Sequence, residues 1–293
     1  MSPPKPPFVG IAALASGCQT IARHLVFFLV SASAADLFAR GLLQLQPPIP
    51  ARPEVQNLES AAPVVLFVLL VGTLTGVAYI NVALACSTNR APAFADLWPG
   101  ARSILRFARA SVSYGFMTFL LYLAASFAGG TGYAQYVVFT KGGPVSIGLA
   151  AFGAAALAVG FLVGRWLVDR QFFGHLIIDR QLGGNAALRA SVPLARSVRW
   201  SLLIVIIVPL AIATAFGAVR VMFTDIPNVP RPLGIPRVGQ DWPPAVVIAV
   251  DAALVVLQTL AAWLGVLALT FVYRAAQRWL ATASSATEGG EVI

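Results

Sequence analysis

The chain has 293 residues, of which 58% are hydrophobic and only 11% are Asp, Glu, Lys or Arg. Soluble domains carry about 25% charged residues, so this composition excludes a water-soluble enzyme, a nucleic-acid-binding domain and a disordered chain. The formal net charge is +9, and the basic residues flank apolar segments without forming the runs typical of nucleic-acid binding. We therefore expect a membrane protein without a nucleic-acid partner.

Six apolar segments are each long enough to cross a bilayer as a helix of about 20 residues. In chain order they cover about 25–45, 61–86, 110–129, 144–164, 201–219 and 245–273. Unpaired backbone groups are too costly in lipid, and the alternation of period two that a β-barrel needs is absent, so each segment is expected to be a helix. The predicted fold class is all-α, a polytopic membrane protein in which residues 1–293 form one integral membrane domain.

The basic residues are distributed unequally between the two sides of this topology. One side comprises both chain ends and the connections 87–109 and 165–200, and it holds 14 of the 20 Lys and Arg residues. The opposite side holds the remaining 6: Arg40, Arg52, Lys141, Arg220, Arg231 and Arg237. Cytoplasmic loops carry an excess of Lys and Arg, which predicts that the N- and C-termini are both cytoplasmic.

A basic amphipathic segment lies in the connection before the fifth span. Asn185 can N-cap a helix there, and Arg189, Arg196 and Arg199 share one face of it. Pro193 should bend this helix. A basic amphipathic helix lies along anionic lipids, so we expect amphipathic interfacial helices on the cytoplasmic side, with lipids of the inner leaflet as partners.

Three short segments carry a resemblance to a known family. They are DL (96–97) followed by PGAR (99–102), LIIDRQLGGNAALRAS (176–191) and FVYR (271–274). With the order of the spans, they resemble a family of bacterial six-helix inner-membrane proteins related to the membrane domain found beside some glycerophosphodiester phosphodiesterases. The resemblance implies an architecture and a bacterial inner-membrane location.

The same resemblance implies no reaction for this chain. The phosphodiesterase activity of the family belongs to a separate soluble domain with metal-binding carboxylates and paired histidines, which we do not expect here. Asp179 and Ser191 match the family pattern. Both are expected to have a structural role in the turn between the fourth and fifth spans.

Ionisable residues inside the predicted spans are candidates for function, because they are costly in lipid. Asp36 and Arg40 lie four residues apart on one helix face. Asp251 lies at a similar depth in the last span, with Gln258 two turns deeper on the same face. We predict that Arg40 bridges Asp36 and Asp251. The cluster either lines a path for an ion, proton or small solute, or pins the first and last helices together, and the second interpretation is favoured.

The remaining reactive side chains fit no catalytic or metal motif. Cys18, His24, Cys86, His175 and Asp179 all fall near the cytoplasmic edge, but their spacing matches neither a zinc nor a haem site. A nucleophile–base pair and a P-loop are also absent from the sequence. We therefore expect no enzymatic activity, no metal and no cofactor.

Two functions follow from this description. The first is a non-enzymatic scaffold or accessory component of the bacterial inner membrane, which presents its helical surfaces to a protein partner or to a second copy of itself. The alternative is a transporter or channel for a small solute or ion that uses the region of Asp36, Arg40 and Asp251.

Overall fold

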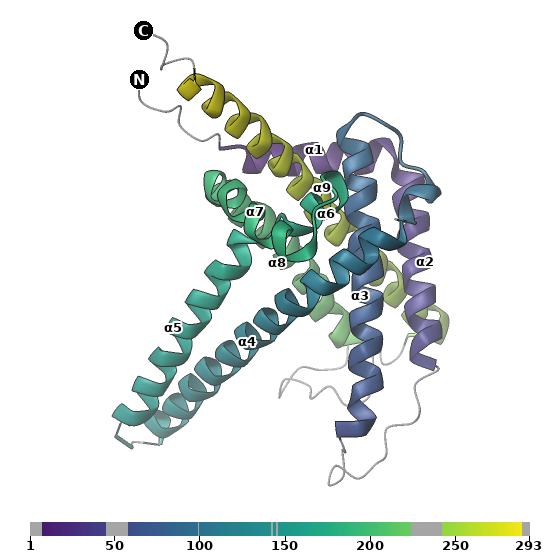
Figure 1. Cartoon of the computed structure of the whole chain (residues 1–293). Helices are drawn as coiled ribbons and strands as arrows, with labels where there is room; N and C mark the ends of the chain where they lie inside the picture. The colour runs from purple at the N-terminus through teal and green to yellow at the C-terminus, as the bar shows by residue number, and fades with distance from the viewer. Residues whose placement is uncertain are drawn as a thin grey trace. The chain divides into compact units, whose positions relative to one another are not determined.

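The computed structural model describes residues 8–44, 58–98, 100–141, 143–144, 146–223 and 242–288, and within these ranges every regular element is a helix (Figure 1). For residues 35–44, 58–71, 221–223, 244 and 285–288, the description covers the backbone alone. The chain divides into two compact units, one of Met1–Pro99 with Trp200–Ile293 and one of Gly100–Arg199. That the whole chain forms one membrane domain stays a prediction.

Among the described residues, four helices are long and apolar enough to cross a membrane: Ala101–Thr140, Ile147–Asp179, Arg199–Arg220 and Ala245–Ser284. A fifth span results if the bent pair Gly10–Arg23 and Leu25–Ala34 is counted as one. The predicted span at 61–86 falls within the helix Leu58–Ser87. The side chains of this helix are described only over Gly72–Ser87, a stretch that is apolar but shorter than the four helices above. The all-helical class and the presence of helices apolar enough to cross a membrane are thus confirmed, while the number six stays a prediction.

The second unit is a helical hairpin with two shorter helices beside it. α4 (Ala101–Thr140) and α5 (Ile147–Asp169) pack along each other, and α6 (Phe173–Asp179) and α7 (Gly184–Ser197) pack together and against α4 (Figure 1). At about 1.5 Å per residue, the 40 residues of α4 are about 60 Å long. The predicted span 110–129 is therefore the middle of a much longer helix.

The apolar face of α7 is covered by protein. Ala187, Leu188, Leu194 and Ala195 are buried, and α7 contacts α4, α5 and α6. The helix begins at Gly184 with Gly183 in the extended N-cap position, so the prediction that Asn185 caps it is wrong. A location of α7 at a membrane interface stays a prediction.

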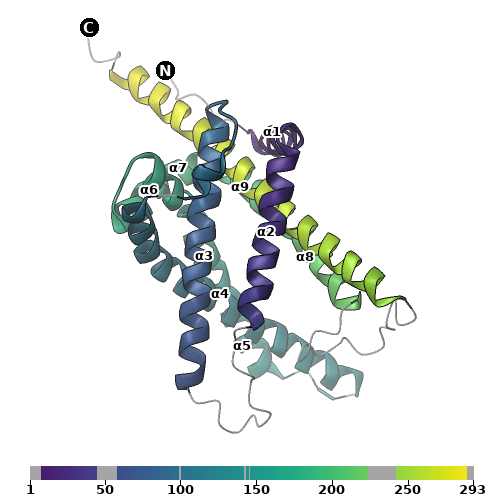
Figure 2. The same ribbon diagram turned by 90° about the vertical axis from the view of Figure 1, so that its right-hand side faces the viewer.

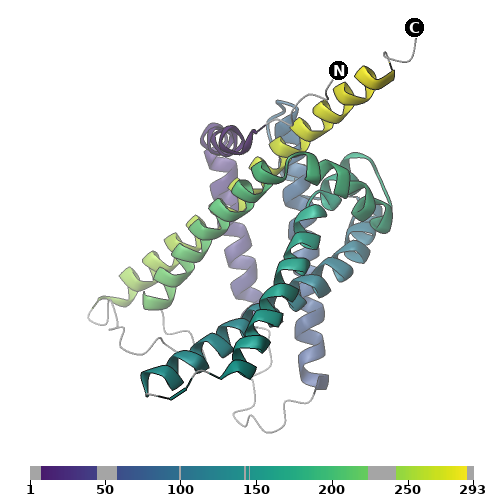
Figure 3. The same ribbon diagram turned by 90° about the vertical axis from the view of Figure 1, so that its left-hand side faces the viewer.

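The first unit is built around its last helix. α9 (Pro244–Glu288) contacts α1 (Gly10–Arg23), α2 (Leu25–Gln44) and α3 (Leu58–Ser87), as Figure 2 shows for α2 and α3. α8 (Arg199–Phe223) runs alongside α9 (Figure 3). A short 3-10 helix, η2 (Phe94–Leu97), packs on α3.

Aromatic side chains make the core of this unit. Trp263 of α9 is fully buried, and its ring stacks on Tyr79 of α3 at 3.8 Å between centroids. Phe28 of α2 meets the same indole edge-on at 5.1 Å. Val82, Ala83 and Leu267 complete the cluster. Since aromatic pairs of this kind add to the free energy of burial, the cluster holds α2, α3 and α9 together.

Small residues let α1 approach its neighbours closely. Gly10, Ala13 and Gly17 are its buried residues, spaced so that they share one face. A Cβ atom at Gly10 would lie 3.2 Å from the Cα of Ser201 in α8, and one at Gly17 would lie 2.8 Å from Leu264 in α9. α1 is therefore packed tightly against both α8 and α9 of its unit.

Candidate functional site

The predicted intramembrane carboxylate Asp251 forms an ion pair with Arg220. The Nε atom of Arg220 lies 2.6 Å from Oδ1 of Asp251, and Nη2 lies 3.5 Å from Oδ2. Only 10% of the Asp251 side chain and 33% of the Arg220 side chain are exposed. The pair joins the end of α8 to the beginning of α9.

Gln258 lies on the same seam, as predicted from its register with Asp251. Its Nε2 atom donates to the backbone oxygen of Ala213 in α8 at 3.2 Å. Further along, Pro209 packs against Gly265, where a Cβ would lie 3.3 Å from the proline ring. The contacts run in opposite directions along the two helices, so α8 and α9 form an antiparallel hairpin with polar contacts at two levels.

The predicted bridge from Arg40 to Asp36 and Asp251 falls partly outside the described residues. The backbone of α2 includes Asp36 and Arg40, but their side chains are not among those described. Their participation in the cluster stays a prediction. Sequence reasoning missed Arg220 as the partner of Asp251. Its position at the end of the preceding span was the available signal.

Ser191, one of the two residues that match the family pattern, lies in α7 and has a structural role. The Ser191 hydroxyl is completely buried and accepts a hydrogen bond from the backbone N–H of Phe172, between α5 and α6. Asp179 ends α6 and is exposed. The two family-like residues thus occupy different environments within the same unit.

Sequence reasoning also missed a buried carboxylate of the second unit, Asp169. Asp169 is 4% exposed and accepts hydrogen bonds from Arg199 at 2.7 Å and Arg196 at 3.2 Å. Two of the three arginines that were expected to face lipid therefore pair with a carboxylate of the protein. Arg189 is exposed on α7.

A basic cavity of about 460 Å³ lies in the first unit and is bounded by α1, α3 and α9. The residues of α1 that line it include Ser16, Thr20 and Arg23, which lie on one helix face because they are spaced by three or four. His24 follows them and also lines the cavity. The last turns of α1 therefore form one wall of the cavity.

The second wall is the end of α3 and the turn after it. Ala83, Cys86 and Ser87 line the cavity from α3, and Asn89 and Arg90 from the turn. Asn89 has φ of 59°, a left-handed conformation that closes helix C-termini and that asparagine tolerates. This turn ends the helix and brings Arg90 to the lining of the cavity.

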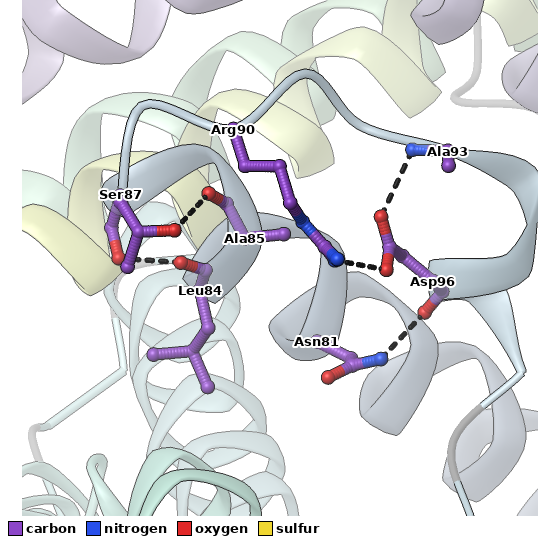
Figure 4. A network of polar contacts seen from close by, with 8 residues as sticks. Asn81, Leu84, Ala85, Ser87, Arg90, Ala93 and Asp96 are labelled. Atoms are coloured by element: carbon purple, nitrogen blue, oxygen red, sulfur yellow. Dashed lines mark hydrogen bonds and ion pairs between the residues drawn. The ribbon is translucent and has the colours of Figure 1, made fainter.

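Arg90 is held by Asp96 of η2 (Figure 4). Asp96 is 8% exposed. Its second carboxylate oxygen accepts from the backbone N–H of Ala93 at 2.9 Å, and its backbone oxygen accepts from Nδ2 of Asn81 at 2.8 Å. The carboxylate is thus fully engaged, and it fixes the loop that carries Arg90.

The third wall is a stripe of α9. Leu267, Phe271, Arg274 and Arg278 recur at helical spacing along it and line the cavity. Arg274 is oriented by hydrogen bonds from Nε to the Ser87 hydroxyl at 3.4 Å and from Nη1 to Gln277. The cavity therefore combines apolar side chains with four arginines.

The cysteines and histidines do not assemble into a metal site in the described part of the chain. Within those residues there is no group of three or more His, Cys, Asp or Glu side chains that could hold a metal ion. His24 and Cys86 line the same cavity of the first unit, whereas Cys18 is exposed on α1. His175 is fully buried in the second unit.

Comparison of the chain with protein-family models, with curated proteins and with solved structures finds no match.

Proposed function

We propose that this chain is a non-enzymatic integral membrane protein that serves as a scaffold or accessory component of the bacterial inner membrane. The proposal includes six spans, cytoplasmic termini and contacts with anionic lipids and with a protein partner or a second copy. The apolar helices support the membrane location, the unequal distribution of Lys and Arg supports the orientation, and the family resemblance supports the bacterial membrane.

The observation that carries the scaffold function is the ion pair between Arg220 and Asp251. Both carboxylate oxygens of Asp251 lie within hydrogen-bonding distance of the guanidinium. Charged groups in a membrane are usually paired, and pairing of this kind supports assembly when it joins neighbouring helices. Here the ion pair joins α8 to α9, which supports a role in stabilising this hairpin.

Charge reversal tests this role. Arg220→Asp and Asp251→Arg should each lower the melting temperature of the detergent-solubilised protein, because each places two like charges together. The double variant restores opposite charges and should recover most of the loss. A double variant no more stable than the worse single variant would contradict a structural pair.

The transporter remains the alternative, and the polar seam between α8 and α9 is the observation that favours it. Asp251 and Gln258 both bond to α8, in which Pro209 interrupts the backbone donors. A proton or solute flux into liposomes that is abolished by Asp251→Asn, with the melting temperature unchanged, would support transport. Flux equal to that of empty liposomes supports the scaffold.

The orientation has its own test. Reporter domains active only in the periplasm, fused after residue 50 or residue 141, should be active, whereas a fusion after residue 184 should be inactive. The opposite pattern would overturn the proposed orientation without bearing on the ion pair.

A further inference from the structure

The basic cavity between α1, α3 and α9 collects positive charge without acidic residues in its lining. Arg23, Arg90, Arg274 and Arg278 line it, together with His24. Asp96 offsets one of these charges through Arg90. Like charges grouped around one cavity repel each other, so an anion in the cavity would stabilise the arrangement.

Two of the arginines keep their hydrogen-bond donors available. Within the described residues, neither Arg23 nor Arg278 has a side-chain hydrogen bond or ion pair, and both are exposed. They face the cavity from different helices, α1 and α9. A guanidinium offers five donors in a planar fork, which matches the oxygens of a phosphate.

The other two arginines are positioned in advance. Asp96 holds Arg90, and the hydroxyl of Ser87 accepts a hydrogen bond from Arg274. Preorganised donors lose less conformational entropy when a ligand binds. The cavity therefore offers both fixed and available guanidinium groups.

The size and the remaining lining restrict the ligand further. A volume of about 460 Å³ falls within the range of small-molecule sites. Leu267 and Phe271 of α9 and Ala83 of α3 add apolar surface beside the arginines. The combination fits an anion attached to a less polar group better than it fits a bare inorganic ion.

We propose that this cavity binds a phosphate-bearing anion, with Arg23 and Arg278 donating hydrogen bonds to the phosphate oxygens. The phosphate belongs either to the headgroup of an anionic phospholipid, which basic pockets between membrane helices bind, or to a soluble phosphate ester. A lipid headgroup would assign a site to the anionic-lipid contact of the proposed function and rests on it, whereas a soluble ester goes beyond it. Binding at this cavity is measurable whether or not the scaffold role holds.

Calorimetry of the purified protein in a neutral detergent tests the soluble source, with glycerol 3-phosphate and inorganic phosphate as probes. The double variant Arg23→Gln with Arg278→Gln removes two available guanidinium groups. It should weaken binding by at least about tenfold, the usual effect of losing one charged hydrogen bond. The control Arg165→Gln with Arg189→Gln removes two exposed arginines of the other unit and should change binding by less than about twofold.

Nanodiscs test the lipid source. The protein is extracted from discs of phosphatidylcholine alone or of phosphatidylcholine with one quarter phosphatidylglycerol, and retained lipid is measured by native mass spectrometry. Retention of phosphatidylglycerol that is lost in the Arg23 and Arg278 variant but kept in the control identifies a lipid headgroup. Binding of the soluble probes with the same dependence identifies a soluble ester.

Cys86 reports on the location of the ligand, because it lines the cavity. In a Cys18→Ser background it is the single remaining cysteine. Glycerol 3-phosphate or phosphatidylglycerol, whichever binds, should slow its alkylation by a small maleimide at least about threefold, the occupancy effect expected near saturation. Three results would each overturn the proposal: no binding of either probe class, equal loss of binding in the control variant, or binding with no protection of Cys86.

Discussion

The backbone N–H of Phe172 donates a 3.0 Å hydrogen bond to the hydroxyl of Ser191. Phe172 lies in the turn between α5 and α6, Ser191 lies in α7, and both are completely buried. A buried N–H that loses its acceptor costs free energy because no water replaces the bond. The serine of the family-like segment therefore fastens α7 to the turn before α6.

Ser191→Ala should lower the free energy of unfolding by about 1–3 kcal/mol, since the Phe172 N–H would be left without this acceptor. Ser197→Ala is the matched control on the same helix. Its hydroxyl donates to the Leu194 carbonyl one turn away, and its loss should cost less than about 0.5 kcal/mol. Unfolding in detergent micelles measures both, and equal losses would contradict the assigned role of Ser191.

Gly184→Ala should destabilise the packing of α7 on α4. The new Cβ would lie 2.9 Å from the backbone oxygen of Arg106 and 3.2 Å from the nitrogen of Ala110, so backbone has to move. We expect a loss of about 1–3 kcal/mol, seen as a lower melting temperature.

The neighbouring glycine supplies the control for this change. A Cβ at Gly183 meets nothing within 4 Å, and its φ of −67° suits any residue. Gly183→Ala should therefore alter stability by less than about 0.5 kcal/mol. If the two variants melt at the same temperature, the close approach of α7 to α4 is contradicted.

Two substitutions at Asp96 separate its charge from its role as a hydrogen-bond acceptor. Asp96→Ala removes the partner of Arg90 and the acceptor for the Ala93 N–H, and should cost about 2–3 kcal/mol. Asp96→Asn keeps an oxygen for Ala93 and should cost about 1 kcal/mol. Chemical unfolding ranks the two variants, and a larger loss for the asparagine would contradict this division.

Trp263→Ala should be among the most destabilising single substitutions in the first unit. The indole is fully buried between Tyr79 and Phe28, and truncating a buried Trp costs about 3–5 kcal/mol. Trp200 is 73% exposed, so Trp200→Ala serves as the control and should cost less than about 0.5 kcal/mol. Thermal unfolding followed by circular dichroism compares them. Similar losses would show that the aromatic cluster is not the core of the unit.

The helical class of the fold was predictable from composition, but the helix ends were not. α4 begins at Ala101 instead of near residue 110, because the basic stretch before the apolar segment continues the same helix without an internal proline. Conversely, α1 ends at Arg23 although neither glycine nor proline follows it. Apolarity marks where a helix can enter lipid, whereas the hydrogen-bonded ends depend on local packing.

The candidate sites show the same limit. The register of Asp251 and Gln258 on one helix face was predicted, and both residues bond to α8. The partner Arg220 lies 31 residues away in the chain, where helical periodicity gives no information. Arg23, Arg90, Arg274 and Arg278 were visible only as orientation signals, since three helices have to pack together before they surround one cavity.

The break at His24 turns α1 away from α2 by 87°. Arg23 is the last residue of α1 and Arg278 lies in α9, so the direction that α1 takes at this break places Arg23 beside the cavity that Arg278 also lines. The close approach of Gly10 to α8 and of Gly17 to α9 holds α1 in this direction. A larger residue at Gly10, which does not line the cavity, should therefore still alter the shape of the cavity.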